Sequence, residues 1–163
     1  MTHSDSFNRP AMDGIGPESR CSGPAPLRVL VVDDEPEIRL MLRLILEQSD
    51  CRMDFAGSFA EGRDCLLGMA PDLVLLDIGL GGGCDGLALC AELKRASRGL
   101  FPVVIMLTAD DSPRTVAEAR RRGADGYLVK PVTPTQILGL IDSFEAWRLD
   151  SVRTPPAFWP APR

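Results

Sequence analysis

Residues 72–77 read DLVLLD, a nearly unbroken apolar run that ends on a carboxylate. A parallel strand that helices cover on both faces has this near-continuous apolar character, whereas a strand with one wet face alternates between apolar and polar residues. Two further runs, LRVLVV at 27–32 and PVVIML at 102–107, have the same character. The stretch therefore predicts a buried strand over 72–76 in the middle of a parallel sheet.

Outward from this run, short apolar runs alternate with longer stretches of helical period. This alternation is typical of an α/β fold, a doubly wound parallel sheet with helices on both faces. The last helical stripe is Ile137, Leu140, Ile141, Phe144 and Trp147. The predicted strands are 27–32, 52–56, 72–76, 102–107 and 126–129. The predicted helices are the stripe 38–46 with Pro36 in its first turn, then 59–69, 87–97, 113–122 and 136–148.

The composition indicates one globular domain: 163 residues, of which 45% are hydrophobic and 25% charged. We expect a folded body over 27–149, between a flexible tail over 1–26 and a Pro-rich tail over 150–163. The net charge of −5 argues against direct nucleic-acid binding. The apolar runs are too short to span a bilayer and no signal peptide is visible, so a cytoplasmic location is expected. The single histidine, His3, argues against histidine-based catalysis.

Polar residues follow the apolar runs at the points where the predicted strands end. In an open α/β sheet, ligands bind beyond the carboxyl ends of the strands, so these residues are candidates for one shared site. They are Asp33 and Asp34 after the first strand, Asp77 after the third, Thr108 after the fourth and Lys130 after the fifth.

Three carboxylates at one edge repel each other, and a divalent cation would allow all of them to stay ionised. Mg²⁺ (or Mn²⁺) fits, because it prefers oxygen ligands and binds through one or two carboxylates together with a phosphate. A carboxylate is also a nucleophile toward phosphorus, and Asp77 is the best candidate because it ends the most apolar strand. Lys130 and the Thr108 hydroxyl would then hold phosphoryl oxygens.

Four stretches together resemble the signatures of response-regulator receiver domains, of the chemotaxis-regulator-like, stand-alone type used in two-component signalling. They are VVDDE at 31–35, LLD at 75–77, LTA at 107–109 and GADGYLVKP at 123–131. The resemblance covers the folded body. It implies a flavodoxin-like, five-stranded parallel sheet in the order 2-1-3-4-5.

The resemblance also implies a role for each acidic residue. Asp77 resembles the phosphoacceptor of the family. Asp34 and Asp77 resemble the direct metal ligands, with the backbone carbonyl of Gly79 as a third ligand and Asp33 acting mainly through water.

Lys130 resembles the family's phosphate contact, and the peptide bond before Pro131 is expected to be cis. Thr108 and Tyr127 resemble the switch pair, in which the hydroxyl turns toward the phosphoryl group and the ring moves into the space left free. A histidine kinase or phosphotransfer protein would donate the phosphoryl group. An unknown downstream protein, or a dimer through the face of the fourth helix, fifth strand and fifth helix, would read the result.

The resemblance therefore implies a single-domain regulator that is a phosphoacceptor module and not an enzyme. Such a module assists its own phosphoryl transfer and its slow dephosphorylation. The loop 79–86 departs from the family pattern, since it lacks the usual proline and is about one residue longer. This departure leaves open an alternative, a constitutive adaptor that keeps the fold and signals without phosphate.

Other residues allow simpler or different interpretations. Asp34 could cap the first helix, with Glu37 three residues later as in a capping box. A third function, nucleotide binding, rests on the GxGxxG pattern of Gly81, Gly83 and Gly86. The basic run 120–122 fits a solvated helix end or an anionic partner. The Phe158–Trp159 pair fits a docking motif, packing on its own domain, or disorder.

Overall fold

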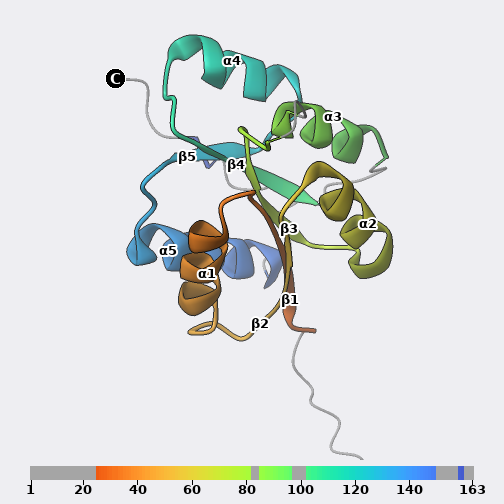
Figure 1. Cartoon of the computed structure of the whole chain (residues 1–163). Helices are drawn as coiled ribbons and strands as arrows, with labels where there is room; N and C mark the ends of the chain where they lie inside the picture. Colours follow the sequence, from red (N-terminus) through yellow and green to blue (C-terminus); the bar gives the residue numbers. More distant parts are fainter. Residues whose placement is uncertain (1–24, 82–84, 97–101, 150–157, 160–163) are drawn as a thin grey trace, which may run out of the picture.

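The computed structural model describes residues 25–81, 85–96, 102–149 and 158–159. Its strands form one sheet, in which every neighbouring pair is parallel and the order is β2-β1-β3-β4-β5 (Figure 1). This arrangement confirms the predicted fold class and strand order. The strands are β1 (Leu27–Val32), β2 (Cys51–Ala56), β3 (Leu73–Asp77), β4 (Val103–Thr108) and β5 (Gly126–Val129).

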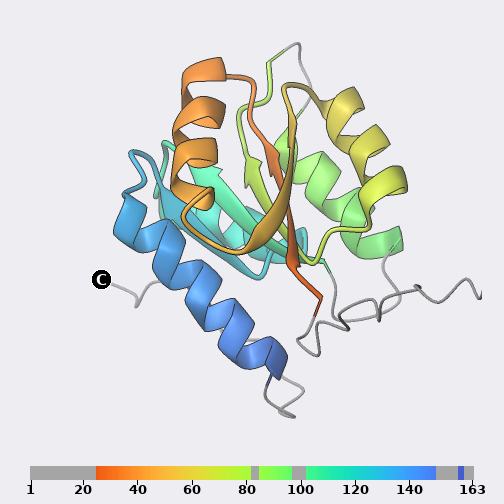
Figure 2. The same ribbon diagram turned by 90° about the horizontal axis from the view of Figure 1, so that it is seen from below.

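The helices cover both faces of the sheet, as Figures 1 and 2 show, with α1 and α5 on one face and α2 and α3 on the other. Their bounds are α1 (Pro36–Leu46), α2 (Phe59–Met69), α3 (Gly86–Ala96), α4 (Pro113–Arg121) and α5 (Pro134–Leu149). In the part of the chain that the structure describes, no helix is long and apolar enough to span a bilayer.

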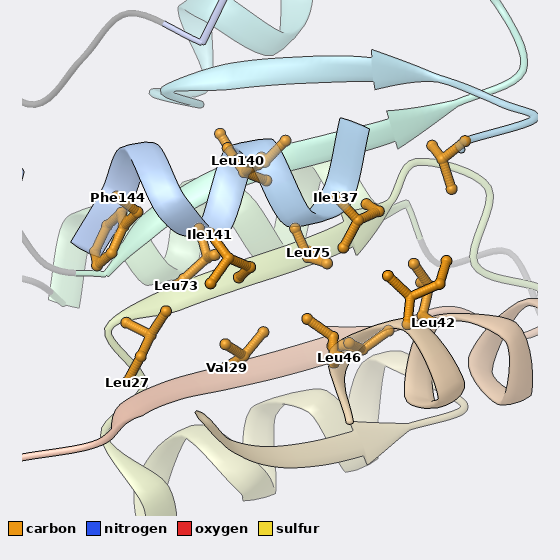
Figure 3. Packing of buried hydrophobic residues seen from close by; sticks show 14 of the residues in the cluster. Leu27, Val29, Leu42, Leu46, Leu73, Leu75, Ile137, Leu140, Ile141 and Phe144 are labelled. Carbon is orange, nitrogen blue, oxygen red and sulfur yellow. The ribbon is translucent and has the colours of Figure 1, made fainter. Parts of the chain in front are cut away.

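Side chains of the central strands alternate between two cores, as the twofold period of a strand requires. On the α1/α5 face, Leu73 and Leu75 of β3 contact the buried stripe of α5, which includes Ile141 and Phe144 (Figure 3). On the opposite face, Val74 and Leu76 belong to the core that packs under α2, α3 and α4. The apolar run that predicted the fold is therefore buried on both sides.

The predicted bounds of β1, α2 and β5 are confirmed, whereas the other predicted bounds differ from the structure by one or two residues. α5 begins at Pro134 and not at 136, because Thr133 caps it: the Gln136 N–H donates to Thr133 Oγ1 at 3.3 Å, and the Thr133 N–H donates to Gln136 Oε1 at 2.8 Å. β3 runs from Leu73 to Asp77 and not from 72 to 76. Asp72 instead binds Arg28 through its side chain.

Two residues of the C-terminal segment are described, and they pack on the domain itself. Phe158 forms an isolated parallel bridge with Gly126 of β5, and Trp159 lies against the ring of Tyr127. Of the three interpretations of this aromatic pair, packing on its own domain is confirmed. The predicted N-terminal tail lies outside the described residues up to position 24.

Candidate functional site

The carboxyl ends of β1, β3 and β5 bring three of the predicted site residues into direct contact. Asp33 follows β1, Asp77 is the last residue of β3, and Lys130 follows β5. The Lys130 ammonium lies 2.8 Å from Asp33 Oδ2 and 3.0 Å from Asp77 Oδ1. The expectation that these residues share one edge of the sheet is confirmed.

Asp33 is fully buried, and its neighbours hold it in place. Its Oδ1 accepts a hydrogen bond from the Glu35 N–H at 2.9 Å, and its backbone carbonyl accepts one from the Arg39 guanidinium at 2.6 Å. Glu35 also reaches Lys130, with 3.2 Å between Oε1 and Nζ. Neither Glu35 nor Arg39 was expected from the sequence to support the site, because an ordinary solvated helix start has the same residue types there.

Burial and charge act in opposite directions on the two central groups. Burial raises the pKa of Asp77, and the nearby Asp33 charge adds to this effect, while Lys130 and the Gly79 backbone oppose it. Burial alone would lower the pKa of Lys130, but its bonds to Asp33 and Asp77 outweigh burial and raise it. Lys130 is therefore a cation at neutral pH, held between two carboxylates.

Asp34 is exposed and does not cap the first helix. The N-cap residue of α1 is Glu35, whose side chain makes no capping bond, so the capping interpretation of Asp34 is wrong. Asp34 Oδ2 instead accepts a hydrogen bond from the Gly81 N–H at 3.0 Å. This bond links the end of β1 to the loop that follows β3.

The three aspartates form a cluster whose chemistry fits a hard divalent cation. One carboxylate oxygen from each of Asp33, Asp34 and Asp77 lies within 4.8 Å of the other two. Oxygen donors of this kind are the ligands that Mg²⁺ prefers, and two carboxylates with waters and a phosphate complete its octahedron. Gly79 adjoins the cluster, since a Cβ there would lie 3.6 Å from Asp77 Oδ2. Its carbonyl as a third ligand stays a prediction.

The Thr108 hydroxyl points to the loop after β4. It donates to the Asp110 carbonyl at 2.9 Å and accepts from the Asp110 N–H at 3.0 Å. In the register of β4 and β5, Thr108 pairs with Val129 and Met106 pairs with Tyr127, so the predicted switch residues Thr108 and Tyr127 belong to the same face of the sheet. The Lys130–Pro131 peptide bond is cis, as expected.

The glycines behind the nucleotide-binding alternative serve the chain itself where they are described. A Cβ on Gly86 would lie 1.9 Å from the Asp77 carbonyl oxygen, so only glycine lets α3 start this close to β3. The Gly81 N–H is engaged with Asp34. Gly83 lies outside the described residues.

Comparison with known proteins agrees with this site. A family model described as a response regulator receiver domain matches residues 29–142. The phosphate regulon transcriptional regulatory protein PhoB of Escherichia coli (strain K12) is 36% identical over 114 residues, which are 70% of this chain and 49% of that protein. The transcriptional regulatory protein ResD of Bacillus subtilis (strain 168) is 33% identical over 68% of this chain and 45% of its own length. The chain thus spans about half the length of these curated relatives.

Solved structures show the same architecture. The chemotaxis protein CheY4 of Vibrio cholerae has a TM-score of 0.67 and 27% identity, and covers 72% of this chain and 98% of its own. The receiver domain of NtrX from Brucella abortus has a TM-score of 0.65 and 32% identity, and covers 75% of this chain and 99% of its own.

Proposed function

Because this chain belongs to the response-regulator receiver domain family of two-component systems, a family of signalling modules and not of classical enzymes, we propose that Asp77 is its phosphoacceptor. A histidine kinase or a histidine phosphotransfer protein would donate the phosphoryl group. The phosphorylated domain would signal through changed protein interactions. We assign residues 27–149 to the receiver unit and place 1–26 and 150–163 outside it.

The observation that carries the proposal is the Lys130 ammonium, which contacts both Asp33 and Asp77 beside the third carboxylate of Asp34. An ion pair that only stabilised the fold would need one carboxylate for one cation. Here the half-buried Lys130 pairs with both Asp33 and Asp77, and with the exposed Glu35. The Asp34 carboxylate belongs to the same acidic cluster and makes no ion pair with Lys130 in the part of the chain that the structure describes, so the surplus negative charge favours a further cation. An excess of carboxylates over cations is what a site that binds Mg²⁺ together with a phosphoryl group requires.

Each group has a separate role in the proposed transfer. An ionised Asp77 oxygen bonds to phosphorus while the bond from phosphorus to the donor's leaving group breaks, and the leaving group takes the electron pair. Lys130 lies within reach of the phosphoryl oxygens and the Thr108 hydroxyl can turn to them, so both would balance the charge on these oxygens. Mg²⁺, held by Asp34 and Asp77 with the Gly79 carbonyl and with Asp33 through water, would neutralise charge on the phosphoryl oxygens. The same groups would support slow dephosphorylation.

The response would pass from Thr108 to Tyr127, which occupy one face of β4 and β5. When the Thr108 hydroxyl leaves Asp110 for the phosphoryl group, the Tyr127 ring would move toward the space left free. The surface of α4, β5 and α5 would then bind a downstream protein or a second copy of the chain. We expect the domain to act in the cytoplasm and, with its net charge of −5, not to bind nucleic acid directly.

Intact mass after incubation with Mg²⁺ and acetyl phosphate tests the proposal. The native chain should gain one labile phosphoryl group, while Asp77→Asn and the native chain in EDTA should gain none. A second control is Asp72→Asn, which changes an aspartate at the opposite end of β3. Failure of the native chain to gain mass, under conditions that label a known receiver domain, would refute the proposal and favour the phosphate-independent adaptor.

A further inference from the structure

β5 is an edge strand of the sheet, and its outer side is engaged by the chain's own C-terminal segment. The sheet order pairs β5 with β4 alone among the strands. On the outer side, the Tyr127 N–H donates to the Phe158 carbonyl at 3.3 Å, and Gly126 bridges Phe158 in the parallel sense. Unpaired edge groups are the usual template for strand addition by another chain. Here the segment takes that position.

The two aromatic residues straddle the sheet in the way that a sixth strand would. Phe158 packs against the core on the α1/α5 face, whereas Trp159 packs against the core on the opposite face. Successive residues of a strand point to opposite faces, so this arrangement follows from extended backbone at the edge. Both side chains are half-buried. The dipeptide therefore extends both apolar layers beyond β5.

Gly126 makes the contact possible. A Cβ on this residue would lie 2.5 Å from both the Cβ and the carbonyl oxygen of Phe158, and the third-nearest atom is also in Phe158. The close neighbours of such a Cβ thus belong to the docked segment and not to the domain. The backbone of Gly126 is not in the left-handed region, so alanine at this position would block the segment without backbone strain.

Trp159 connects the segment to the proposed switch residue. Its ring centroid lies 5.5 Å from that of Tyr127, with the planes tilted by 57°. On α4, the Arg120 guanidinium lies 4.3 Å from the centre of the Trp159 ring. The other two arginines of the run 120–122 pair with Glu118, so Arg120 differs from them in facing the segment.

We propose that Phe158–Trp159 is an internal ligand of the β5 edge, which closes this edge to other strands until phosphorylation moves Tyr127. Residues 150–157 tether the segment to α5, and a short tether gives an effective concentration of about millimolar, so a weak contact is enough to keep it docked. The docking half of the proposal stands on the contacts above. The release half rests on the proposed function, because it needs a phosphoryl group on Asp77.

Fluorescence quenching by acrylamide measures docking directly in the full-length chain. The chain has two tryptophans, so Trp147→Phe leaves Trp159 as the single reporter. In this background, Gly126→Ala should raise the quenching constant of Trp159 several-fold. Gly139→Ala on α5, where a Cβ would meet no atom within 4 Å, is the matched control and should leave it unchanged. Circular dichroism verifies that each variant is folded.

A second variant serves if Gly126→Ala does not fold. Arg120→Gln removes the cation over the Trp159 ring, so it should weaken docking about threefold and raise the quenching constant of Trp159. Equal quenching of Trp159 in the Trp147→Phe background with and without these changes would overturn the proposal, because the segment would then not be docked.

Phosphorylation tests the release half. Acetyl phosphate and Mg²⁺ should raise Trp159 quenching toward the Gly126→Ala level, and should leave Asp77→Asn unchanged. Intact mass is recorded on the same samples. A mass gain without a change in quenching would overturn release while the proposed function holds. No mass gain would refute the proposed function, and with it release, while the Gly126→Ala comparison still decides docking.

Discussion

Replacing Lys130 by methionine should lower the free energy of unfolding by about 3 kcal/mol at neutral pH in EDTA. Methionine keeps an unbranched chain of similar length, so the change removes the charge with little loss of volume. It leaves two carboxylates without their shared cation, and the side chains of Asp33 and Asp77 are only 0% and 8% exposed. Breaking a buried pair by removing one partner typically costs about 3–5 kcal/mol. We expect the lower end because burial raises the pKa of Asp77, so this carboxylate takes up a proton more readily than an exposed one.

Urea and thermal unfolding followed by circular dichroism measure this loss, which corresponds to about 6–12 °C in Tm for a chain of this size. The pKa of Lys130 is raised, so its contribution is fully present below its usual value of 10.5 and is lost only above that pH. On the acid side, the difference between native and variant should shrink as Asp77, whose pKa burial raises, becomes protonated. Mg²⁺ should stabilise the variant more than the native chain.

The double variant Lys130→Met with Asp33→Asn distinguishes the cost of leaving buried carboxylates without a cation from the cost of lost side-chain packing. It should recover at least half of the loss, because one buried charge disappears together with its partner. If the double variant is as unstable as Lys130→Met, or if Lys130→Met is as stable as the native chain, the electrostatic reasoning is refuted.

Three further predictions use the same unfolding measurements. Because burial raises the pKa of Asp77 above 3.8, the native chain loses stability as pH rises through this region and Asp77→Asn does not. In EDTA at neutral pH, Asp77→Asn should therefore be more stable than the native chain, and a less stable variant would contradict the pKa argument. Burial alone would raise the pKa of Asp72, but Arg28 lowers it below 3.8, so Asp72→Asn should cost about 1–2 kcal/mol at neutral pH. That cost should vanish as pH falls through the lowered pKa, and its persistence in acid would argue against the ion pair. Gly86→Ala should lower the free energy of unfolding by about 1–3 kcal/mol, because the new methyl group meets the Asp77 carbonyl. Gly139→Ala, where a methyl group meets no atom within 4 Å, should not lower it. Equal stability of the two variants would contradict the close approach of α3 to β3.

The fold was predictable because its central strands are buried on both faces. Such strands leave unbroken apolar runs, and polar residues at their ends mark one edge of the sheet. The contact of Asp33, Asp77 and Lys130 follows from this topology, although the three residues are far apart in the sequence. A local pattern was a poorer guide: the capping box at Asp34 and Glu37 had the right spacing, but the Gly81 N–H binds Asp34 instead.

Other features depend on tertiary contacts that the hydrophobic pattern of the sequence does not predict. The bond from Arg39 to the Asp33 carbonyl depends on how α1 leaves the sheet. The docking of Phe158 and Trp159 depends on the absence of a side chain at Gly126 in a strand that lies earlier in the chain. In the sequence, this glycine only precedes a short apolar run. One- and two-residue errors at helix ends have a similar origin, as the cap formed by Thr133 shows.

The alternation of the central strands also limits which changes of length the protein tolerates. Leu73 and Leu75 face the α1/α5 core, and Asp77 continues the same alternate positions to the end of β3. Deleting or inserting one residue inside β3 would turn every later side chain of the strand to the other face. The apolar residues could exchange cores at moderate cost, but the carboxylate of Asp77 would then leave Lys130. A substitution within β3 therefore lowers stability by an amount that depends on the side chain, whereas an insertion or deletion of one residue separates the Asp77 carboxylate from Lys130.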